Sequence, residues 1–277
     1  MWGHVGVSKA WENRLLHKIC LTNDDGPASP GLLSLAEHLK DTADLIVVVP
    51  DGQRSASGKG QTLNRPLRVT HDANAIGYRM ITHDGLPADS VVMAQHFAKN
   101  LDLFVSGINA GANAGYQSIL TSGTVGAAIE AALRGYPAVA ISMEVSSDNW
   151  FSQSGKDTDF HVICEMATRI INRILETGMP RNTSVLNLNF PREITDRTRV
   201  VVTRPAKARL KDEIERRIDP NGSPYYWVRG VEITPPKDTD VYEVLTRGNI
   251  SLSPITIEGV TDAELDAVRD FVRSLSL

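Results

Sequence analysis

The chain of 277 residues is 42% hydrophobic and 22% charged, and it carries a formal net charge of −4. These values exclude a disordered, collagen-like or coiled-coil chain and fit one α/β domain with a smaller appended piece. No excess of positive charge favours a nucleic-acid polymer or an anionic membrane as partner, and no apolar run reaches the roughly 20 residues that a membrane span needs.

The N-terminal residues 1–17 have neither the continuous apolar stretch nor the cleavage site of a secretory signal. We therefore expect an N-terminal extension that precedes the first strand. The two cysteines, Cys20 and Cys164, lie in apolar stretches and form no C-x-x-C pair. This pattern predicts buried thiols in a reducing compartment, so we expect a cytoplasmic protein.

Strand and helix signals alternate through the first two thirds of the chain. Short valine-rich or isoleucine-rich runs predict strands buried on both faces, and apolar residues three or four apart predict helices. We expect strands at Lys18–Thr22, Ala43–Pro50, Leu101–Ser106, Ala138–Met143 and Ser184–Asn189, with a hairpin or edge region at Leu67–Thr82. We expect helices at Pro30–Lys40, Pro87–Lys99, Gly123–Gly135 and Phe160–Glu176. This alternation predicts an α/β fold, a three-layer, doubly wound and mostly parallel sheet.

The character of the sequence changes after about Arg192. Short β-like segments, prolines and charged residues replace the helical periodicity. A final helix is expected at Thr261–Ser274, whose first residue is the N-cap and whose Glu264 stands at the capping-box position. We therefore divide the chain into a core at 18–192 and, at 193–277, a β-rich extension that ends in a helix.

Three polar segments follow predicted strands: NDDG after the first, DGQRSASGKGQT after the second and SGINAGANAG after the third. In an open parallel sheet, ligands bind beyond the carboxyl ends of the strands. The fold would therefore bring these segments, which are distant in sequence, to one edge of the sheet. This convergence predicts a single functional site there.

Asp24 and Asp25 stand next to each other directly after the first predicted strand. Two neighbouring carboxylates repel, so the pair is costly unless a positive charge neutralises it. A hard divalent cation does so, and it takes its ligands from carboxylate, hydroxyl and amide oxygens. The alternative is a solvated turn in which these side chains cap the next helix. The two other polar segments at the same edge favour the metal site.

Hydroxyl and amide side chains of the other two segments can complete such a site. Ser55 offers a hydroxyl that can bind a metal, orient a water or simply cap a turn. Asn109 and Asn113 each offer an amide oxygen, but asparagine also tolerates left-handed turn geometry. The residue types alone leave these alternatives open.

Small residues at the start of the alanine-rich helix favour anion binding. Ser122, Gly123 and Thr124 expose free backbone N–H groups at the helix N-terminus, and such groups bind phosphate. Ordinary N-capping is a simpler and compatible explanation. Arg54 and Lys59 can add positive charge near a phosphate, although basic residues in loops are mostly solvated.

Other hydrolytic and nucleotide-binding patterns are missing from the sequence. It has no G-x-S-x-G nucleophile motif, no P-loop and no G-x-G-x-x-G fingerprint after the first strand. Five histidines show no metal-ligand spacing, and we expect them to be structural or on the surface: His38, His71, His83, His96 and His161.

Taken in chain order, these segments resemble the SurE family (survival protein E, 5′/3′-nucleotidase). The resemblance runs from Ile19 to about Ile257 and is carried by several separate motifs. They are LTNDDGPASPGL, VVVPDGQRSASG, GLPADSV, LFVSGINAGANAG, TSGTVGAAIEAALRGYPAVAIS, VLNLNFP, RRIDPNGSPYYWVRG and KDTDVYEVLTRGNISLSPITI.

The resemblance implies a Rossmann-like core, one divalent metal ion per subunit (Mg²⁺ or Mn²⁺) and hydrolysis of nucleoside 5′(3′)-monophosphates and of short polyphosphate. It places the metal ligands on Asp24, Asp25, Ser55 and Asn109, of which Asp24, Asp25 and Asn109 are the catalytic residues. It places the phosphate pocket on Asn113, Ser122, Gly123 and Thr124. The family's β-rich extension mediates dimers and tetramers, which implies a homodimer or homotetramer here.

Several residues depart from the family's usual pattern without touching the four metal-ligand positions. Lys59 and Gly60 stand where histidine or asparagine, and then serine, are usual. The other departures are Leu86 for threonine, Tyr116 and Gln117 for acidic residues, and Thr121 for tyrosine or histidine. These changes bear on substrate preference rather than on the reaction class.

We therefore expect metal-assisted hydrolysis, in which a cation draws off phosphate charge and activates a water. Backbone N–H groups near 122–124, together with Asn113, would hold the remaining phosphate oxygens. Direct attack by one aspartate, through a phospho-aspartate, stays open. The alternative functions are a nucleotide- or phosphate-binding protein with little turnover, motivated by the changed loop residues, and a structural oligomer whose C-terminal arm is the functional part.

Overall fold

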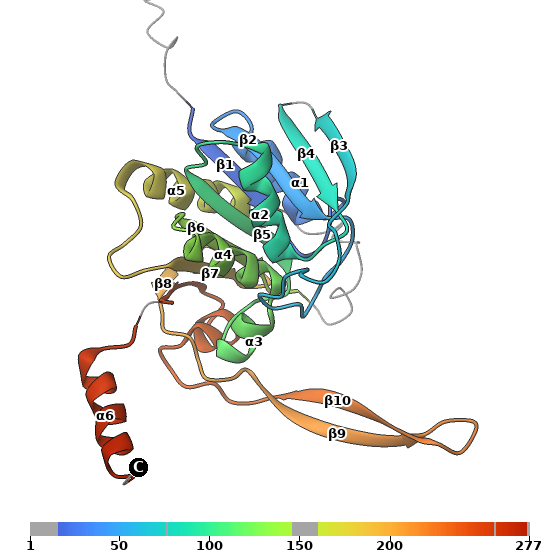
Figure 1. Ribbon diagram of the computed structural model, residues 1–277, viewed down its shortest axis with the longest axis vertical. Helices are drawn as coiled ribbons and strands as arrows, with labels where there is room; N and C mark the ends of the chain where they lie inside the picture. Colours follow the sequence, from blue (N-terminus) through green and yellow to red (C-terminus); the bar gives the residue numbers. More distant parts are fainter. Residues whose placement is uncertain (1–15, 76, 146–159, 258, 276–277) are drawn as a thin grey trace, which may run out of the picture.

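The computed structural model describes residues 16–75, 77–145, 160–257 and 259–275. Of the expected N-terminal extension, residues 1–15 lie outside this part of the chain. The described residues form a nine-stranded sheet with helices on both faces, a separate two-stranded hairpin and a terminal helix (Figure 1). None of the described helices is long and apolar enough to cross a membrane.

The large sheet is mostly parallel, as predicted. Its strands, in spatial order, are β3 (Val69–Ala75), β4 (Tyr78–His83), β2 (Asp44–Pro50), β1 (Lys18–Thr22), β5 (Leu103–Ala110), β6 (Ala138–Met143), β7 (Val185–Phe190), β11 (Ile250–Ile255) and β8 (Val200–Val202). The strands from β4 to β7 run parallel to one another. Antiparallel pairs occur only between β3 and β4 and between β7 and β11 among these described strands.

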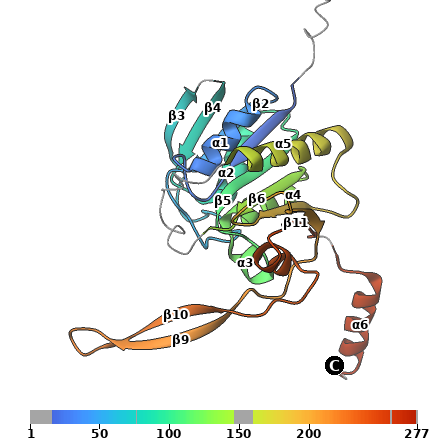
Figure 2. The same cartoon turned by 180° about the vertical axis from the view of Figure 1, so that it is seen from behind.

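Helices cover both faces of the sheet and make it the middle of three layers (Figures 1 and 2). One face carries α1 (Pro30–Leu39) and α5 (Phe160–Thr177), and the other carries α2 (Pro87–Phe97) and α4 (Gly123–Leu133). Strands enclosed in this way are apolar on both sides, and every residue of β6 and β7 is buried. The continuous apolar runs in the sequence therefore have a direct structural cause.

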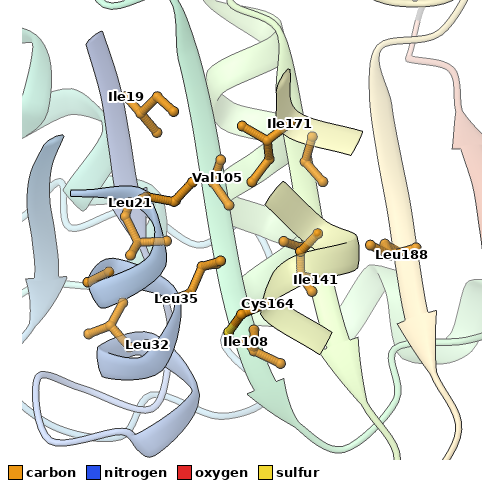
Figure 3. Close-up of a cluster of buried hydrophobic side chains, with 14 of the residues drawn as sticks. Ile19, Leu21, Leu32, Leu35, Val105, Ile108, Ile141, Cys164, Ile171 and Leu188 are labelled. Carbon is orange, nitrogen blue, oxygen red and sulfur yellow. The ribbon is translucent and has the colours of Figure 1, made fainter. Parts of the chain in front are cut away.

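Apolar side chains of α1 and α5 meet the central strands in one cluster, shown in Figure 3. Leu35 of α1 and Ile171 of α5 are both fully buried, and burial of one such side chain contributes roughly 2 kcal/mol to folding. Cys164 lies in the same cluster and Cys20 in the cluster on the opposite face, both as free thiols. Both cysteines are fully buried, so the expected burial is confirmed. Burial raises the pKa of the Cys20 thiol, which disfavours its reactive thiolate form.

The C-terminal third adds strands to the same sheet and two projecting elements. β8 and β11 extend the sheet beyond β7. The sheet therefore continues across the predicted division between 18–192 and 193–277, and that division stays a prediction. The hairpin of β9 (Leu210–Ile218) and β10 (Pro224–Glu232) projects from the body, and so does α6 (Asp262–Arg273) (Figures 1 and 2). A short π-helix, η2 (Tyr242–Thr246), lies between β10 and β11.

The expected capping box of α6 is present. The Thr261 hydroxyl accepts from the Glu264 N–H at 3.3 Å, and the Glu264 carboxylate accepts from the Thr261 N–H at 2.7 Å. The helix nevertheless buries none of its residues. Its apolar face is therefore not part of the core of this subunit.

The segment after the third predicted strand differs from the expectation in one respect and contains one additional element. β5 continues to Ala110, so Asn109 lies in the strand, opposite Ser142, and not in a loop. The pairing resumes there after a register shift that follows Ser106. A short helix, α3 (Tyr116–Thr121), was not expected, because only Ile119 of its six residues is buried and its sequence shows no apolar periodicity.

Candidate active site

The candidate site lies where the winding direction of the sheet reverses. The next strand in the chain after β1, β2, pairs with one edge of β1, and the later strand β5 pairs with the other edge. The segments that leave the carboxyl ends of β1 and β5 therefore diverge, and ligands bind at such a switch point in open α/β sheets. This strand order brings the NDDG turn next to Asn109, although the two are far apart in sequence.

Asp24 is buried at the end of β1, with 3% of its surface exposed. The Thr124 hydroxyl donates a hydrogen bond to its Oδ1, and the Arg54 N–H donates to its backbone carbonyl at 2.7 Å. The turn is closed by Asn23, whose side chain exchanges two hydrogen bonds with the backbone of Gly26. The chain itself therefore fixes the orientation of the Asp24 carboxylate.

Asp25 is half-buried and has a single amide donor, the Ala110 N–H, 3.3 Å from its Oδ2. Burial, together with the charge of Asp24, raises the pKa of Asp25 from 3.8 to about 7. Burial also raises the pKa of Asp24, although the Thr124 hydroxyl acts in the opposite direction. Two carboxylates in this environment need a cation to remain ionised together at neutral pH.

Ser55 and Asn109 line the same cleft as Asp24. Gln53 Nε2 donates to Ser55 Oγ at 3.0 Å. Asn109 Nδ2 donates to the Gly111 carbonyl at 2.7 Å, which uses the donor end of the amide and leaves its oxygen as an acceptor for a cation. Together with Asp24 and Asp25, these side chains make an all-oxygen donor set of the kind that Mg²⁺ and Mn²⁺ prefer.

The described segments contain no group of three or more His, Cys, Asp or Glu side chains that could hold a metal. A cation site in this part of the chain therefore depends on mixed donors such as these. Of the four ligands that the family resemblance implies, Asp24, Ser55 and Asn109 line one cleft, and Asp25 adjoins it through Ala110.

The cleft has a volume of about 240 Å³. Five of the predicted site residues line it: Asp24, Ser55, Asn109, Asn113 and Ser122. The other three, Asp25, Gly123 and Thr124, do not line it but adjoin residues that do. A larger cleft of about 630 Å³ opens beside Lys18 and Asp44, at the amino ends of β1 and β2, and contains none of the predicted residues. Volume alone therefore does not identify the site.

The N-terminus of α4 directly adjoins Asp24. Ser122 caps the helix, because its Oγ accepts from the Val125 N–H at 3.1 Å. A Cβ atom at Gly123 would lie 2.9 Å from Asp24 Oδ2 and 2.7 Å from Ser57 Oγ, closer than real side chains tolerate. The positive end of the helix dipole thus lies against a carboxylate, where it favours negative charge.

Asn113 is held by the ends of β6 and β7. Its N–H donates to Asn189 Oδ1 at 2.8 Å, and its carbonyl accepts from Asn187 Nδ2 at 2.9 Å. Its own Nδ2 donates to Ser142 Oγ at 2.9 Å. Asn113 is therefore held in a fixed position at the cleft, which it lines.

Arg54 and Lys59 do not bring positive charge into the cleft. Arg54 pairs with Asp51 at 2.7 Å and Lys59 with Glu130 at 2.6 Å, and neither lines the cleft. Among the described residues that do line it, the one cationic side chain is Arg209, at the base of the β9–β10 hairpin. Sequence analysis missed Arg209, because it stands in the charged stretch RLKDEIERR, which looks like a solvated surface.

Comparisons with known proteins identify the family of this chain. The family described as "Survival protein SurE" matches residues 19–212. The chain is similar to a 5′-nucleotidase SurE of Pyrobaculum arsenaticum, with 37% identity over 90% of this chain and 94% of that protein. It is also similar to one of Methanospirillum hungatei, with 40% identity over 91% of this chain and 90% of the other.

A solved structure gives the same result for the fold. The crystal structure of a SurE protein from Aquifex aeolicus superposes with a TM-score of 0.76 at 30% identity. The superposition covers 92% of this chain and 99% of that one. The similarity therefore extends over the core sheet and most of the C-terminal third.

Proposed function

The chain belongs to the SurE family, and on that basis we propose that it is a metal-dependent phosphomonoesterase that releases phosphate from nucleoside 5′(3′)-monophosphates. Relatives named 5′-nucleotidase SurE share about 37% of their residues with it over most of both chains. The chain is accordingly a hydrolase of the nucleotidase type. Short polyphosphate is a further substrate of the proposal, because its terminal phosphate offers the same anionic group to the same cleft.

The observation that carries the metal dependence is the adjacent pair of Asp24, which is buried, and Asp25, which is half-buried. Burial raises the pKa of both carboxyl groups, and the charge of Asp24 raises that of Asp25 further, so a bound cation would favour the ionised form of both. Ser55 and Asn109 add a hydroxyl and an amide oxygen from two other segments. We assign these four residues as ligands of one divalent ion per subunit, Mg²⁺ or Mn²⁺, because such ions take oxygen donors.

When bound there, the ion would supply Lewis-acid stabilisation of phosphate charge and would acidify a water. The chain's own residues position the phosphate. Asn113, which lines the cleft, would donate its second Nδ2 hydrogen to the phosphate, and the N-terminus of α4 at Ser122–Thr124 would direct the positive end of its dipole toward the phosphate oxygens. Thr124 holds Asp24 in the orientation that its ligand role needs.

The attacking group is either a water or one of the two aspartates. Attack by an aspartate forms an acyl phosphate, which hydroxylamine traps as a hydroxamate. Direct attack by water offers hydroxylamine no target. Trapping during turnover of the wild-type enzyme therefore separates the two routes.

The test of the proposed function is phosphate release from a panel of nucleoside monophosphates. We expect release that EDTA abolishes and that Mg²⁺ or Mn²⁺ restores. Asp24→Asn should remove it, whereas Asp41→Asn, at an exposed position after α1, should leave it unchanged. Tight binding of a monophosphate without release, by folded protein with either metal, would instead establish a binding protein with little turnover.

The proposal includes a homodimer or homotetramer. An isolated two-stranded ribbon is marginally stable in water, yet the β9–β10 hairpin projects from the body with Trp227 55% and Val228 65% exposed. Phe271 of α6 is 65% exposed as well. Exposed apolar surfaces of this kind mark interaction sites. If truncation before the hairpin left phosphate release intact, a role of assembly in activity would be ruled out.

The proposal also places the protein in the cytoplasm. Its two described cysteines, Cys20 and Cys164, are buried free thiols, which suits a reducing compartment. The acidic net charge of −4 gives no reason to expect a nucleic-acid polymer or a membrane surface as partner. Fractionation of cells followed by immunoblotting tests the location.

A further inference from the structure

Arg209 and Glu144 form a buried, two-pronged ion pair beside the cleft. The guanidinium Nη1 and Nη2 atoms each lie 2.9 Å from one carboxylate oxygen of Glu144. The side chains are 6% and 14% exposed, respectively. The pair joins residues 65 positions apart. Such a fork-shaped contact fixes both side chains, and loss of Arg209 leaves the Glu144 carboxylate without its ion-pair partner. Arg209 also lies 3.9 Å from an oxygen of the exposed Glu232.

Glu144 connects this pair to the segment that carries the two candidate site asparagines. It directly follows β6, and its N–H is held by the Phe190 carbonyl at 2.9 Å. Its Oε2 accepts from the Ala112 N–H at 3.3 Å. The neighbouring Gly111 N–H donates to the Met143 carbonyl at 2.7 Å. Ala112 therefore depends on the Glu144 carboxylate for its position, and it lies between Asn109 and Asn113.

Arg209 connects the pair to the base of the hairpin. Its carbonyl accepts from the Ile233 N–H at 3.3 Å, which ties it to the returning strand. The adjacent Leu210 N–H donates to Gln117 Oε1 of α3 at 3.2 Å. Figures 1 and 2 both show the hairpin leaving the body next to α3. Arg209 and Leu210 thus line the same cleft as Asp24 and Ser55.

We propose that Arg209 and Glu144 are a positioning pair, which couples the base of the β9–β10 hairpin to the metal-binding and phosphate-binding asparagines Asn109 and Asn113. The inference rests on the proposed function, because it gives the pair a role in that same site. Neither residue is assigned a contact with substrate. The hairpin then belongs to the catalytic unit and is more than an arm for assembly.

The physical reason is the cost of leaving one charge alone. If Arg209 loses its charge, Glu144 is a buried carboxylate with one amide donor, and it will turn toward water. The Ala112 N–H then loses its acceptor, and the Asn109–Asn113 segment loses the contact that fixes it. Outer partners of metal ligands typically change metal affinity or activity 10–100-fold when they are mutated.

The experiment compares Arg209→Met, Glu144→Gln and the double variant in the full-length chain. The Kd for Mn²⁺ is measured on metal-free protein by calorimetry, and kcat and KM are measured with one nucleoside monophosphate. We expect each single variant to weaken Mn²⁺ binding or to lower kcat by at least about tenfold. We expect the double variant to lose no more than the worse single variant, because both changes disrupt one interaction.

Two further variants separate positioning from folding. Arg209→Lys keeps the charge but loses the fork, so it should recover part of the loss. Arg229→Met removes a hairpin arginine that pairs with Glu215 on the exposed part of the ribbon, and it should match the wild type. Circular dichroism and thermal melting of each variant identify any that fails to fold. If Arg209→Met does not fold, the results for Arg209→Lys and Glu144→Gln test the proposal without it.

Direct contact of Arg209 with the substrate phosphate would overturn the proposal and has its own signature. It predicts a raised KM for Arg209→Met with unchanged Mn²⁺ affinity, and a Glu144→Gln variant that is normal or improved. Additive losses in the double variant would also overturn it. Absence of phosphate release by the wild type counts against the proposed function instead, and the Mn²⁺ affinities of the variants still test the pair.

Discussion

The hydroxyl group of Thr124 donates a hydrogen bond to Oδ1 of Asp24 across a separation of 100 residues. This contact joins the first turn of α4 to the end of β1. It means that the Ser122–Thr124 segment serves Asp24 as well as any phosphate in the cleft. Asp24 and a bound phosphate would both be anions, which the positive end of a helix dipole favours.

Removal of the Thr124 hydroxyl should reduce activity without unfolding the protein. Thr124→Val keeps the shape of the side chain but takes the donor from Asp24, so the carboxylate loses its fixed orientation. We expect kcat/KM for a nucleoside monophosphate to fall about 10–100-fold. Thr177→Val, whose hydroxyl bonds only backbone carbonyls at the end of α5, is the matched control. Equal rates for both variants would show that Asp24 needs no donor.

Addition of a methyl group at Gly123 should be more damaging. The new Cβ would lie 2.8 Å from Asp24 Cβ and 2.9 Å from Asp24 Oδ2, so either α4 or the NDDG turn must move. We expect Gly123→Ala to abolish detectable phosphate release and to weaken Mn²⁺ binding in a calorimetric titration. Gly259→Ala, where a Cβ meets nothing within 4 Å, should behave as wild type. A fully active Gly123→Ala enzyme is incompatible with this close packing.

Asp25→Asn should abolish phosphate release but raise the melting temperature of the metal-free protein. The pKa of Asp25 is raised from 3.8 in the unfolded chain to about 7 in the folded protein. Ionisation therefore costs the folded state stability, and this cost grows as pH rises from about 4 to 7 and is constant above. In EDTA at pH 8, we expect Asp25→Asn to melt on the order of 5 °C above wild type.

The same Asp25→Asn variant should release no phosphate, because an amide cannot neutralise a divalent ion as a carboxylate does. The difference in melting temperature between this variant and the wild type should shrink as the pH falls toward 4. At pH 8, Mg²⁺ should also reduce this difference, because it stabilises only the wild type. Asp41→Asn serves as the control for loss of an exposed carboxylate. A lower melting temperature for Asp25→Asn at pH 8 would contradict the assignment of this side chain.

His83 should make the fold sensitive to acid. It is fully buried, its Nδ1 accepts from the Gly85 N–H at 3.0 Å, and its Nε2 lies 2.7 Å from Ser90 Oγ. Burial lowers the pKa of His83 from 6.5 to about 4. The unfolded chain therefore takes up a proton first, and the free energy of unfolding should fall by up to about 3 kcal/mol as pH drops from 6.5 to 4.

Urea denaturation at pH 7 and pH 5 measures this effect. His83→Gln should show a smaller loss of stability between the two pH values than the wild type, whatever its stability at pH 7. His96→Gln, on the exposed side of α2, should keep the wild-type dependence. If His83→Gln loses as much stability between pH 7 and pH 5 as the wild type does, another group causes the acid sensitivity.

A charge introduced on the hairpin should weaken the proposed homodimer or homotetramer. Trp227 and Val228 are exposed on the ribbon, where burial against another copy would remove their apolar surface from water. We expect light scattering to show a smaller species for Trp227→Glu than for the wild type. Arg216→Glu, on the same ribbon but without apolar surface to bury, is the control. A wild-type chain that is monomeric at micromolar concentration would refute the prediction.

The sequence by itself determined the fold class and the candidate residues of the site. The buried strands were readable because a strand covered on both faces is apolar throughout, as β6 and β7 are. Asp24 and Asp25 were readable because adjacent carboxylates after a buried strand are costly without a cation. The motifs around them gave the family, which the comparisons bear out.

Only the tertiary structure decided which distant residues meet. Strand order is not written in any local pattern, so the neighbourhood of β1 and β5, and with it the place of Asn109, came from the sheet. Arg209 had no local signal at all, because its surroundings in sequence are those of a solvated strand. Arg209 can be buried because Glu144, which directly follows β6, supplies the opposite charge. Sequence periodicity reports which residues are buried, whereas the pairing of charges across elements depends on the assembled fold.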